Sequence, residues 1–385
     1  MTPPVFDILI VGAGPAGTTC ALALHRAGLR VALLEKAVFP RDKICGDAIP
    51  GPAFKVMDAI HPDWGHQMRQ FSKGQVVRTS KIFAPNGKSF ALHWVTHAYN
   101  ARRLDFDQWL VHLLKENTST EIFEGVKVNS IIQKENAWIV TAKTHSGAVR
   151  TFRAKIIVGA DGANGVCARR LAGFEMDKNH HCAAVRTYVT GIADLAPTVN
   201  EFYLVSQYSP GYFWIFPLGN GAANVGFGML SAEISRRRLH LKSVLTDLLT
   251  RFPPLQKRFG NARITADIKG FGLPLGSRIA PLSGDGFLLA GDAGSLIDPL
   301  QGHGIDKAMA SGKMAAEQAL RCLENHRTDA AFMKQYDDEI YRKWGAEFRR
   351  NERMLRWCAR YPTLLNGVAN LAQFEPVRRF FQKFA

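Results

Sequence analysis

The stretch that most restricts the fold lies near the start of the chain and reads FDILIVGAGPAGTTCALALHRAGLRVALLEK. An apolar strand over residues 7–11 leads into the pattern G-x-G-x-x-G at residues 12–17. A helix is expected from there to about Arg26, and a second strand ends at the acid Glu35. Strand, glycines, helix, strand and acid thus follow the order of a dinucleotide-binding βαβ unit.

The three glycines of this pattern meet three different needs of a bound dinucleotide. The first permits a tight turn, the second lets the backbone approach a pyrophosphate, and the third lets the helix pack closely on the strand. The phosphates would lie at the helix N-terminus. Glu35 is expected to bind the adenosine ribose and to repel a 2'-phosphate, which favours FAD or NAD over NADP. The predicted phosphate contacts are Gly12, Gly14, Pro15, Ala16 and Gly17.

Two later segments indicate which dinucleotide is bound. VGADGANGVCARRL (158–171) and FLLAGDAGSLIDPLQGHGID (287–306) each look like an apolar strand that runs into an Asp-Gly or Gly-Asp pair. A domain that binds only NAD would not need a second Gly-Asp loop so late in the chain. Together with the first motif, these segments resemble the flavoprotein family built on the para-hydroxybenzoate hydroxylase fold.

That resemblance implies a fold of α/β and antiparallel β parts. A Rossmann-like FAD domain would carry an inserted substrate domain with an antiparallel sheet, followed by a helical C-terminal tail. We expect the FAD domain at residues 1–75, 101–174 and 271–327, the substrate domain at 76–100 and 175–270, and the tail at 328–385.

The same resemblance implies the further FAD contacts. The late Gly291-Asp292 pair would face the ribityl and pyrophosphate groups, and Asp161-Gly162 would lie near the flavin. Arg103 stands in the pattern R-x-x-F-D-x-x-L, on a helix expected to lie against the cofactor. The other contacts expected are Lys36, Arg41, Cys45, Gly46, Asp47, Val126, Pro299, Gly302, Gly304 and Ile305.

Three stretches point to one branch of that family. FPRDKICGDAIPG (39–51), GYFWIFPLGNGAANVGFGM (211–229) and DPLQGHGI (298–305) resemble signatures of the geranylgeranyl reductases and their relatives. These FAD enzymes hydrogenate isolated carbon–carbon double bonds in isoprenoid chains. The resemblance therefore implies an FAD-dependent oxidoreductase that acts on an apolar, prenyl-type small molecule.

The second of these stretches contains four aromatic residues within residues 212–216. Alternate side chains of a strand face opposite sides, so Tyr212, Trp214 and Phe216 would share one face. They are the predicted substrate-binding residues, forming the wall of a dry chamber for a prenyl chain. The alternative is an ordinary buried strand of a large sheet.

The candidate catalytic residues are Cys45, Tyr212, Trp214 and His303. By resemblance Cys45 lies beside the flavin, where it could relay a proton, although a buried free cysteine is usually a small apolar residue. His303 could donate a proton near neutral pH or could be a solvated loop residue. Tyr212 is a further proton donor or only part of the wall. The helix starting near Ile305 would point its positive end at the flavin and stabilise its reduced, anionic form.

Local patterns predict several elements of the second domain and its surroundings. Asn86-Gly87 between two apolar runs is typical of a type I' hairpin turn. Residues 121–160 alternate like a β-meander, and one helix is expected at about 232–252.

The chain carries a net charge of +16, which indicates an anionic partner. Residues 341–385 contain ten Lys or Arg and three acids, interleaved with aromatic residues, so this tail could contact an anionic membrane or simply pack on the protein. The electron donor could be NAD(P)H or an acidic ferredoxin. No nucleic-acid motif accompanies the charge, and the six cysteines lack metal-ligand spacing. We expect a cytoplasmic protein, with peripheral membrane contact as an option.

Two other functions fit the same motifs. The sequence YFWIFP is close to the W-x-W-x-I-P element of flavin halogenases, which also need a lysine between flavin and substrate. Lys73 and Lys81 lie in the right part of the chain for that, so a halogenase or monooxygenase is the first alternative. The second is a flavin-binding redox protein without catalysis.

Overall fold

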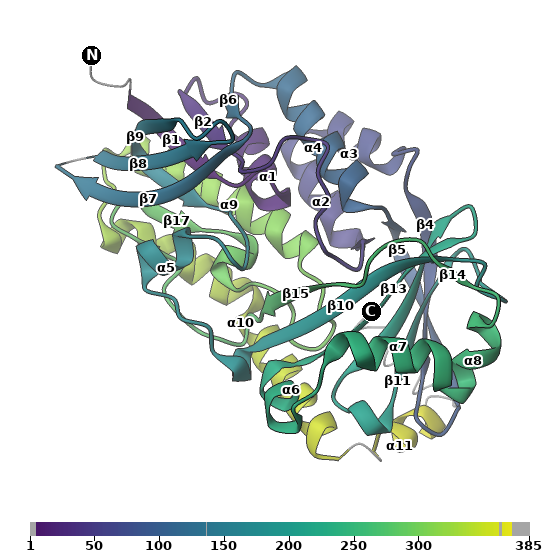
Figure 1. Ribbon diagram of the computed structural model, residues 1–385. Coiled ribbons are helices and arrows are strands. Elements are labelled where there is room, and N and C mark those ends of the chain that lie inside the picture. The colour runs from purple at the N-terminus through teal and green to yellow at the C-terminus, as the bar shows by residue number, and fades with distance from the viewer. Residues whose placement is uncertain (1–4, 136, 362–363, 372–385) are drawn as a thin grey trace.

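The computed structural model describes residues 5–135, 137–361 and 364–371, and Figure 1 shows two sheets at opposite ends of the molecule. The first sheet has the order β16-β17-β9-β1-β2-β6, with β7 and β8 continuing from β9. β1 pairs in parallel with both β2 and β9, as the predicted βαβ unit requires. The strands are β1 (Val5–Val11), β2 (Val31–Leu34), β6 (Glu121–Phe123), β7 (Val126–Lys134), β8 (Ala137–Thr144), β9 (Val149–Gly159), β16 (Ser283–Gly284) and β17 (Phe287–Leu289).

The central strand β1 is apolar because both of its faces are covered. Ile8 and Ile10 pack against helices, whereas Leu9 and Val11 pack against the meander of β7, β8 and β9. The helices around this sheet are α1 (Pro15–Ala23), α2 (Gly51–Ile60), α3 (Pro62–Arg69), α4 (Arg103–Asn117), α5 (Cys167–Ala172), α9 (Ile305–Glu324) and α10 (Ala330–Arg360), with the short turn η3 (Gly291–Gly294).

The second sheet is mainly antiparallel, with the order β14-β10-β13-β12-β11-β4-β5-β3 and β15 added beside β10. Helices α6 (Ser231–Arg237), α7 (Leu241–Arg251) and α8 (Pro253–Phe259) lie at this end of the molecule (Figure 1). Its strands are β3 (Ala48–Ile49), β4 (Gln75–Phe83), β5 (Ser89–Asn100), β10 (His181–Thr190), β11 (Val199–Leu204), β12 (Tyr212–Gly219), β13 (Ala222–Leu230), β14 (Arg263–Ile264) and β15 (Lys269–Pro274). The turns η1 (Lys178–His180) and η2 (Ser206–Tyr208) precede β10 and β12.

These two sheets confirm the predicted fold class. The FAD and substrate domains remain a proposal with the boundaries given above. One strand extends across an expected domain boundary, at 270/271. β15 pairs with β10 in the second sheet from Lys269 to Pro274, on both sides of that boundary. β3 also belongs to this sheet, although it lies within residues 1–75.

Two local predictions were wrong in detail. The hairpin of β4 and β5 forms, but of its two turn residues only Gly87 has a positive φ, at 81°. The N–H of Gly87 donates to the carbonyl of Ala84, so this is a turn followed by one left-handed residue and not a type I' turn. The single helix expected at 232–252 is two helices, because Arg238 at φ 52° ends α6.

The C-terminal segment is helical where it is described, in α10 and α11 (Leu364–Leu371). α10 begins after Asp329, whose side chain accepts from the N–H of Phe332. Its aromatic residues Trp344 and Phe348 pack into the main core and so face the protein, while Trp357 is 60% exposed. The basic cluster expected at 378–383 lies outside the described residues.

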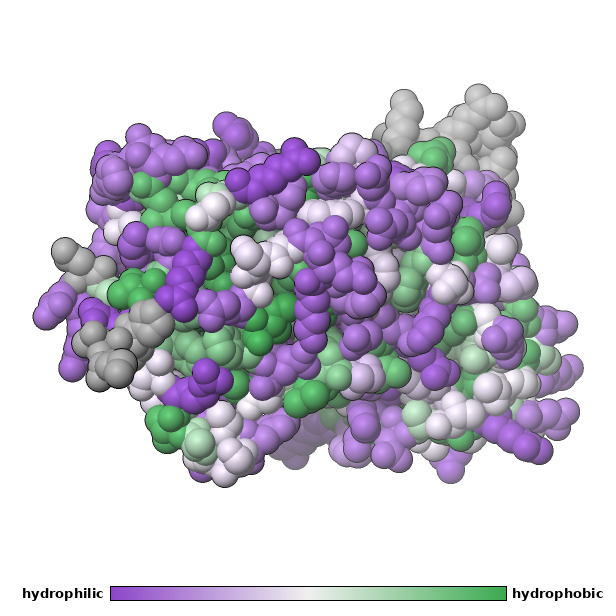
Figure 2. Space-filling view, turned by 90° about the horizontal axis from the view of Figure 1, so that it is seen from above, coloured by the Kyte–Doolittle hydropathy of each residue, from purple (hydrophilic) through white to green (hydrophobic). Residues whose placement is uncertain are grey.

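No helix within the described part of the chain is both long enough and apolar enough to cross a bilayer. On the face shown in Figure 2, hydrophilic residues predominate and hydrophobic residues show in patches between them.

Candidate functional site

The turn between β1 and α1 has the geometry that a close approach of phosphate needs. Gly12 has φ 102°, and a Cβ there would lie 2.4 Å from the carbonyl oxygen of Ala160. A Cβ on Gly17 would lie 1.9 Å from the oxygen of Gly12, so helix and strand could not pack with any larger residue. Gly14 faces open space, and α1 has Pro15 in its first turn and no side-chain cap. The N–H groups of Ala16 and Gly17 in the first turn of α1 are therefore available to an anion.

Glu35 is buried at the end of β2 and is fixed by backbone donors. The N–H groups of Ala13 and Ala37 donate to its two carboxylate oxygens at 2.9 and 3.0 Å, and Arg41 lies 3.9 Å away. The N–H of Val126 donates to the carbonyl of Glu35, which places Val126 beside it. The next residue of the predicted set, Lys36, is exposed. The acid is thus held rigidly next to the glycine turn.

The late Gly-Asp loop meets the glycine turn in space. Gly291 has φ 60°, and a Cβ there would lie 3.1 Å from the Cβ atoms of both Ala16 and Ala308. The following Asp292 makes no side-chain hydrogen bond within the described residues, and a Cβ on Gly304 would lie 3.7 Å from its Oδ1. The first turns of α1 and α9 and the Asp292 carboxylate therefore surround one region.

Arg103, at the start of α4, is buried against a carboxylate. Its guanidinium donates to both oxygens of Asp107, at 2.6 and 2.7 Å, and Arg41 donates to the same group at 2.6 Å. Burial would raise the pKa of Asp107, but the two arginines outweigh it and hold that pKa below its usual range. Cys45, whose side chain is half-buried, is among the groups that act electrostatically on Arg103.

Asp47 joins the Cys45-Gly46-Asp47 loop to the second sheet. Its carboxyl is fully buried and accepts from Tyr188 Oη at 2.9 Å and from Asn224 Nδ2 at 2.8 Å. Asn224 also donates to the carbonyl of Cys45 at 2.8 Å and accepts from Nε1 of Trp214 at 2.9 Å. Burial, opposed by these hydrogen bonds, raises the pKa of Asp47 to about 6.

The aromatic residues of β12 divide between two faces as predicted. Phe213 and Ile215 pack into the apolar core under α7, while Tyr212, Trp214 and Phe216 contact one another on the other face. Phe202 of β11 extends that second face, with its ring 5.2 Å from the ring of Phe216. We call these four rings, Phe202, Tyr212, Trp214 and Phe216, the aromatic face.

The aromatic face lies directly against the Cys45-Gly46-Asp47 loop. A Cβ on Gly46 would lie 3.3 Å from the ring of Phe216 and 3.8 Å from Nε1 of Trp214. Trp214 and Phe216 are 6% and 7% exposed, so the rings are almost covered. The two stretches that the sequence linked to one family are therefore in contact.

The segment 298–304 is shaped by Asp298, which is fully buried. Its Oδ1 accepts from the N–H groups of Leu300 and Gln301, and its Oδ2 accepts from Asn351 of α10 at 2.7 Å. Gly302 adopts φ 71°, with the Tyr212 hydroxyl 2.7 Å from the position of its Cβ. Pro299 is buried in the same segment, which ends at Gly304, just before Ile305 opens α9 without a side-chain cap.

Two candidate catalytic side chains meet partners in this segment. Nδ1 of His303 lies 2.8 Å from Oδ1 of Asp306, and burial lowers the pKa of His303 less than the carboxylate raises it. The net shift is upward, which favours the charged imidazole. The hydroxyl of Tyr212 donates to the carbonyl of Gln301 at 3.1 Å, so its proton is already engaged.

Comparison with known proteins agrees with this arrangement. A family model described as an FAD binding domain matches residues 5–343. The digeranylgeranylglycerophospholipid reductase of Methanoculleus marisnigri is 30% identical, over 94% of this chain and 90% of its own length. Digeranylgeranylglycerophospholipid reductase 1 of Methanopyrus kandleri is also 30% identical, over 89% of this chain and 87% of its own.

The chain belongs to the geranylgeranyl reductase family of FAD-dependent oxidoreductases. Its cofactor is FAD, as the sequence predicted. The open space at Gly14, the uncapped start of α1 and an Asp292 carboxylate without a hydrogen bond in the described residues fit that cofactor.

Solved structures of the family's fold superpose well. A geranylgeranyl bacteriochlorophyll reductase-like protein of Thermoplasma acidophilum has a TM-score of 0.84 at 23% identity, covering 95% of this chain and 91% of that one. The flavin-dependent brominase Bmp2 has a TM-score of 0.79 at 22% identity, covering 99% and 93%. At these identities the likeness shows a shared fold, and the fold alone does not separate reduction from halogenation.

Asp161 has a structural task in this member of the family. Its Oδ2 accepts from the N–H groups of Val166 and Cys167 and so caps the start of α5. Its Oδ1 is buried without a partner, and burial raises the pKa of the group. The next residue, Gly162, has φ 79° and faces open space. The backbone at Gly162 and the free Oδ1 remain candidates for cofactor contact.

Sequence reasoning missed several residues of the site. Lys43 lies with Nζ 3.5 Å from the centre of the Phe271 ring, and Asp292 and Arg103 are among the charges that act on it. Burial lowers the pKa of Lys43 although Asp292 opposes this. Its place between Arg41 and Cys45 in a quoted motif was the available signal. Tyr188, Asn224 and Asp298 were missed as well.

Two cavities among the described residues lie away from the aromatic face. The first, of about 610 Å³, lies between α2, α9 and α10, and the second, of about 400 Å³, lies beside β10 and β15. Neither is lined by Trp214 or Phe216. The apolar tunnel beside those rings therefore stays a prediction.

Proposed function

We propose that this chain reduces carbon–carbon double bonds in the isoprenoid chains of a lipid. The observation that supports this best is the contact of Trp214 and Phe216 with the backbone at Gly46. A prenyl chain lying along these rings would pass the Cys45 loop that the family resemblance places beside the flavin. The substrate class follows the relatives described above, which are named as reductases of digeranylgeranylglycerophospholipid.

In this proposal the protein mainly positions the substrate and keeps water out. FAD in its reduced form would supply the hydride. The aromatic face consists of rigid rings, of which Trp214 and Phe216 are almost covered, and such rings suit a chain that has no hydrogen-bonding atoms. Asn224 would hold Trp214 at a fixed angle to the loop, because one amide bonds both the indole and the carbonyl of Cys45.

The second carbon of the double bond needs a proton, and two groups of the chain can supply one. Cys45 lies next to Gly46, which meets the aromatic face, and it acts electrostatically on Arg103. His303 lies in the segment under Tyr212, and Asp306 raises its pKa. Tyr212 is the weaker candidate because its hydroxyl already donates to Gln301. We therefore assign proton donation to Cys45 or His303.

The proposal is tested by reducing the purified holoenzyme photochemically without oxygen and adding a geranylgeranyl lipid. We expect reoxidation of the flavin and a product that has gained two hydrogens per reduced double bond, as seen by mass spectrometry. Cys45→Ser and His303→Gln should separate the two proton donors. Failure of any alkene to reoxidise the flavin, or brominated product from bromide and oxygen, would overturn the assignment.

For the electron donor we propose an acidic redox protein in preference to NAD(P)H. The net charge of +16 supports this, since opposite charges accelerate encounter at low salt. Reduction of the flavin by a ferredoxin should slow steeply with ionic strength. Equal rates with NADPH, independent of salt, would contradict the proposal.

We also propose peripheral contact of a cytoplasmic protein with an anionic membrane through the end of α10. Trp357 and Tyr361 are 60% and 43% exposed there and lie near Arg356 and Arg360. Cosedimentation with phosphatidylglycerol vesicles should fall on Trp357→Ala. No change on that substitution would reject this contact.

A further inference from the structure

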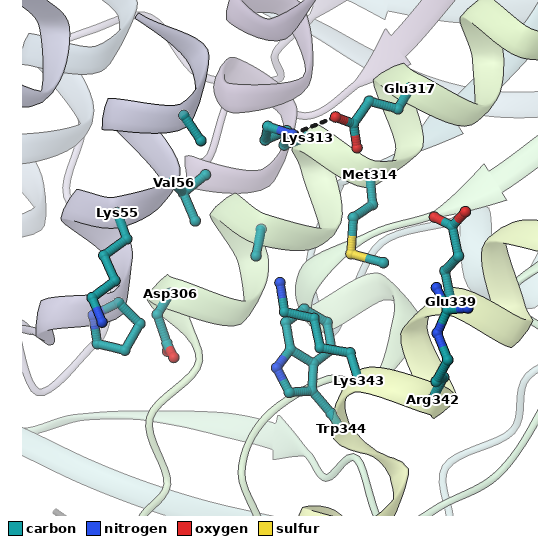
Figure 3. A pocket seen from close by; sticks show the side chains of 13 residues that line it. Lys55, Val56, Asp306, Lys313, Met314, Glu317, Glu339, Arg342, Lys343 and Trp344 are labelled. Carbon is teal, nitrogen blue, oxygen red and sulfur yellow. Dashed lines mark hydrogen bonds and ion pairs between the residues drawn. The ribbon is translucent and has the colours of Figure 1, made fainter. Parts of the chain in front are cut away.

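The larger cavity, of about 610 Å³, is a groove on the outside of the FAD-binding part of the molecule. α9 forms its floor through Ala310 and Met314, α2 one wall through Val56, and α10 the other through Trp344 (Figure 3). Its lining runs along α9 from Asp306 to Glu317, which is roughly 16 Å at the rise of a helix. The groove is thus long, narrow and apolar at its base.

The charges around this groove are not balanced. Each of its three acids already has a cationic partner: Asp306 lies 3.6 Å from Lys307, Glu317 bonds Lys313, and Glu339 lies 3.0 Å from Arg321. Within the part of the chain that the structure describes, the remaining cations of the lining have no carboxylate partner. These are Lys55, Arg342 and Lys343.

These three cations stand on both walls. Lys55 projects from α2, whereas Arg342 and Lys343 come from α10, and all three are exposed (Figure 3). Lys343 also lies 5.1 Å from the centre of the Trp344 ring, so its charge stands over the apolar wall. An anion between the walls could be approached from two helices at once.

We propose that this groove binds a phosphate group carried on an apolar chain. The phosphate would lie between Lys55 and Lys343, and the chain would follow the floor over Ala310 and Met314. The unpaired cations support the anionic end, and the apolar floor supports the tail. The molecule could come from a bilayer or be a soluble phosphate ester, since the recognising chemistry is the same.

This site is separate from the proposed catalytic one. α9 lies between the groove and α1, because a Cβ on Gly312 would lie 2.1 Å from the backbone oxygen of Ala16. None of the four rings of the aromatic face is among the residues that line the groove. A bound ligand would instead contact Asp306, the partner of His303, at one end of the groove.

The test measures binding to the full chain and needs no turnover. Dihexanoylphosphatidate, below its micelle concentration, is titrated calorimetrically into the wild type and into Lys55→Gln/Arg342→Gln/Lys343→Gln. One exposed ion pair between a cation and the phosphate changes the dissociation constant by a factor of about two. Loss of three such pairs should therefore weaken binding about tenfold in the triple variant. The control is Lys127→Gln/Lys134→Gln/Lys143→Gln, which removes the same charge from exposed positions on β7 and β8. It should bind like the wild type.

Three further arms decide the chemistry and the source. Inorganic phosphate should bind more weakly than the phosphatidate because it has no apolar chain, and dihexanoylphosphatidylcholine should bind more weakly because its choline cation cancels the charge of its phosphate. Met314→Glu should weaken phosphatidate binding by putting a carboxylate on the floor. Binding of phosphatidylglycerol vesicles that falls in the triple variant would identify bilayer lipid as the source, and its persistence would identify the soluble ester. Equal loss in both triple variants, or binding of phosphate as tight as that of phosphatidate, would overturn the proposal.

Discussion

Replacing Asn224 by alanine removes the link between the aromatic face and the Cys45 loop. Asn224 is fully buried and makes three hydrogen bonds, two to neutral groups and one to the carboxyl of Asp47. Neutral bonds are worth about 1 kcal/mol each and a bond to a charged group about 1.5 to 3 kcal/mol, so Asn224→Ala should cost about 3.5 to 5 kcal/mol of unfolding free energy. It would also leave the Trp214 indole N–H buried without a partner.

Asn200→Ala is the matched control for this experiment. Asn200 is a buried amide of the same sheet, paired with Asn100 at 2.7 and 3.2 Å, and none of its hydrogen bonds in the described residues reaches the Cys45 loop. We expect it to cost about 2 kcal/mol. Stability is measured by urea unfolding of flavin-free protein, and FAD retention by gel filtration. If Asn224→Ala were no less stable than Asn200→Ala and kept its flavin equally well, the link that Asn224 makes between the aromatic face and the Cys45 loop would have no special role.

Three other predictions concern single groups of the site. Burial raises the pKa of Asp47 from 3.8 to about 6, so its ionisation costs the folded state about 3 kcal/mol. The free energy of unfolding should therefore fall as the pH rises from 4 to 6. Urea titrations of Asp47→Asn should not show this fall. Gly291→Ala, at φ 60° and crowded by the first turns of α1 and α9, should lower the ratio of flavin to protein absorbance, whereas Gly87→Ala, at φ 81° in open space, should not. Asp306 raises the pKa of His303, so a rate that needs the His303 proton should fall only at a pH above the ordinary pKa of histidine. In Asp306→Asn the rate should already fall at a lower pH.

The cofactor site could be predicted because its requirements are local. A positive φ at Gly12 and the contact between Gly17 and the oxygen of Gly12 follow from one tight turn within a few residues. Glu35 stands at the end of the next strand, where the fold brings it to the same turn. The division of β12 into two faces is equally local, since it follows from the two-residue period of a strand.

The partners of Asp47 could not be predicted in this way. Tyr188 and Asn224 lie 141 and 177 residues from it in sequence, and they meet only because β10 and β13 pair in the second sheet. A single polar residue within a strand looks the same whether it faces solvent or a buried carboxyl. Asp298 was missed for a related reason, because its partner Asn351 belongs to a different helix 53 residues away.

The helical tail shows a different limit of sequence reasoning. The aromatic residues of α10 recur with helical spacing, which predicts a covered apolar stripe but does not say what covers it. In the structure Trp344 and Phe348 pack against the main core, so this part of the stripe is internal. Only at the end of α10 does an aromatic residue, Trp357, face outward among arginines.

Alkene reduction and halogenation occur on the same fold, so the positions of the lysines help to distinguish them. Lys73 forms an ion pair with Asp105 on the exposed side of α4. Lys81 of β4 lies opposite Glu201 of β11 in the strand register, so both side chains face the same side of the sheet as Tyr203. Tyr203 belongs to the core under α7, on the side opposite to the aromatic face.

Lys43 is nearer to the site, but the charges that act on it belong mostly to the FAD side. Asp292, Arg103 and Asp107 come from η3 and α4, and the ring under its ammonium group is Phe271 of β15. Lys43 therefore lies where it could balance charge on the cofactor. The ring that it contacts does not belong to the aromatic face. A halogenase needs a lysine between flavin and substrate, whereas an alkene reductase needs that route dry and apolar. Trp214 is 6% exposed and contacts the rings of Tyr212 and Phe216, and Lys43 contacts neither ring in the described residues.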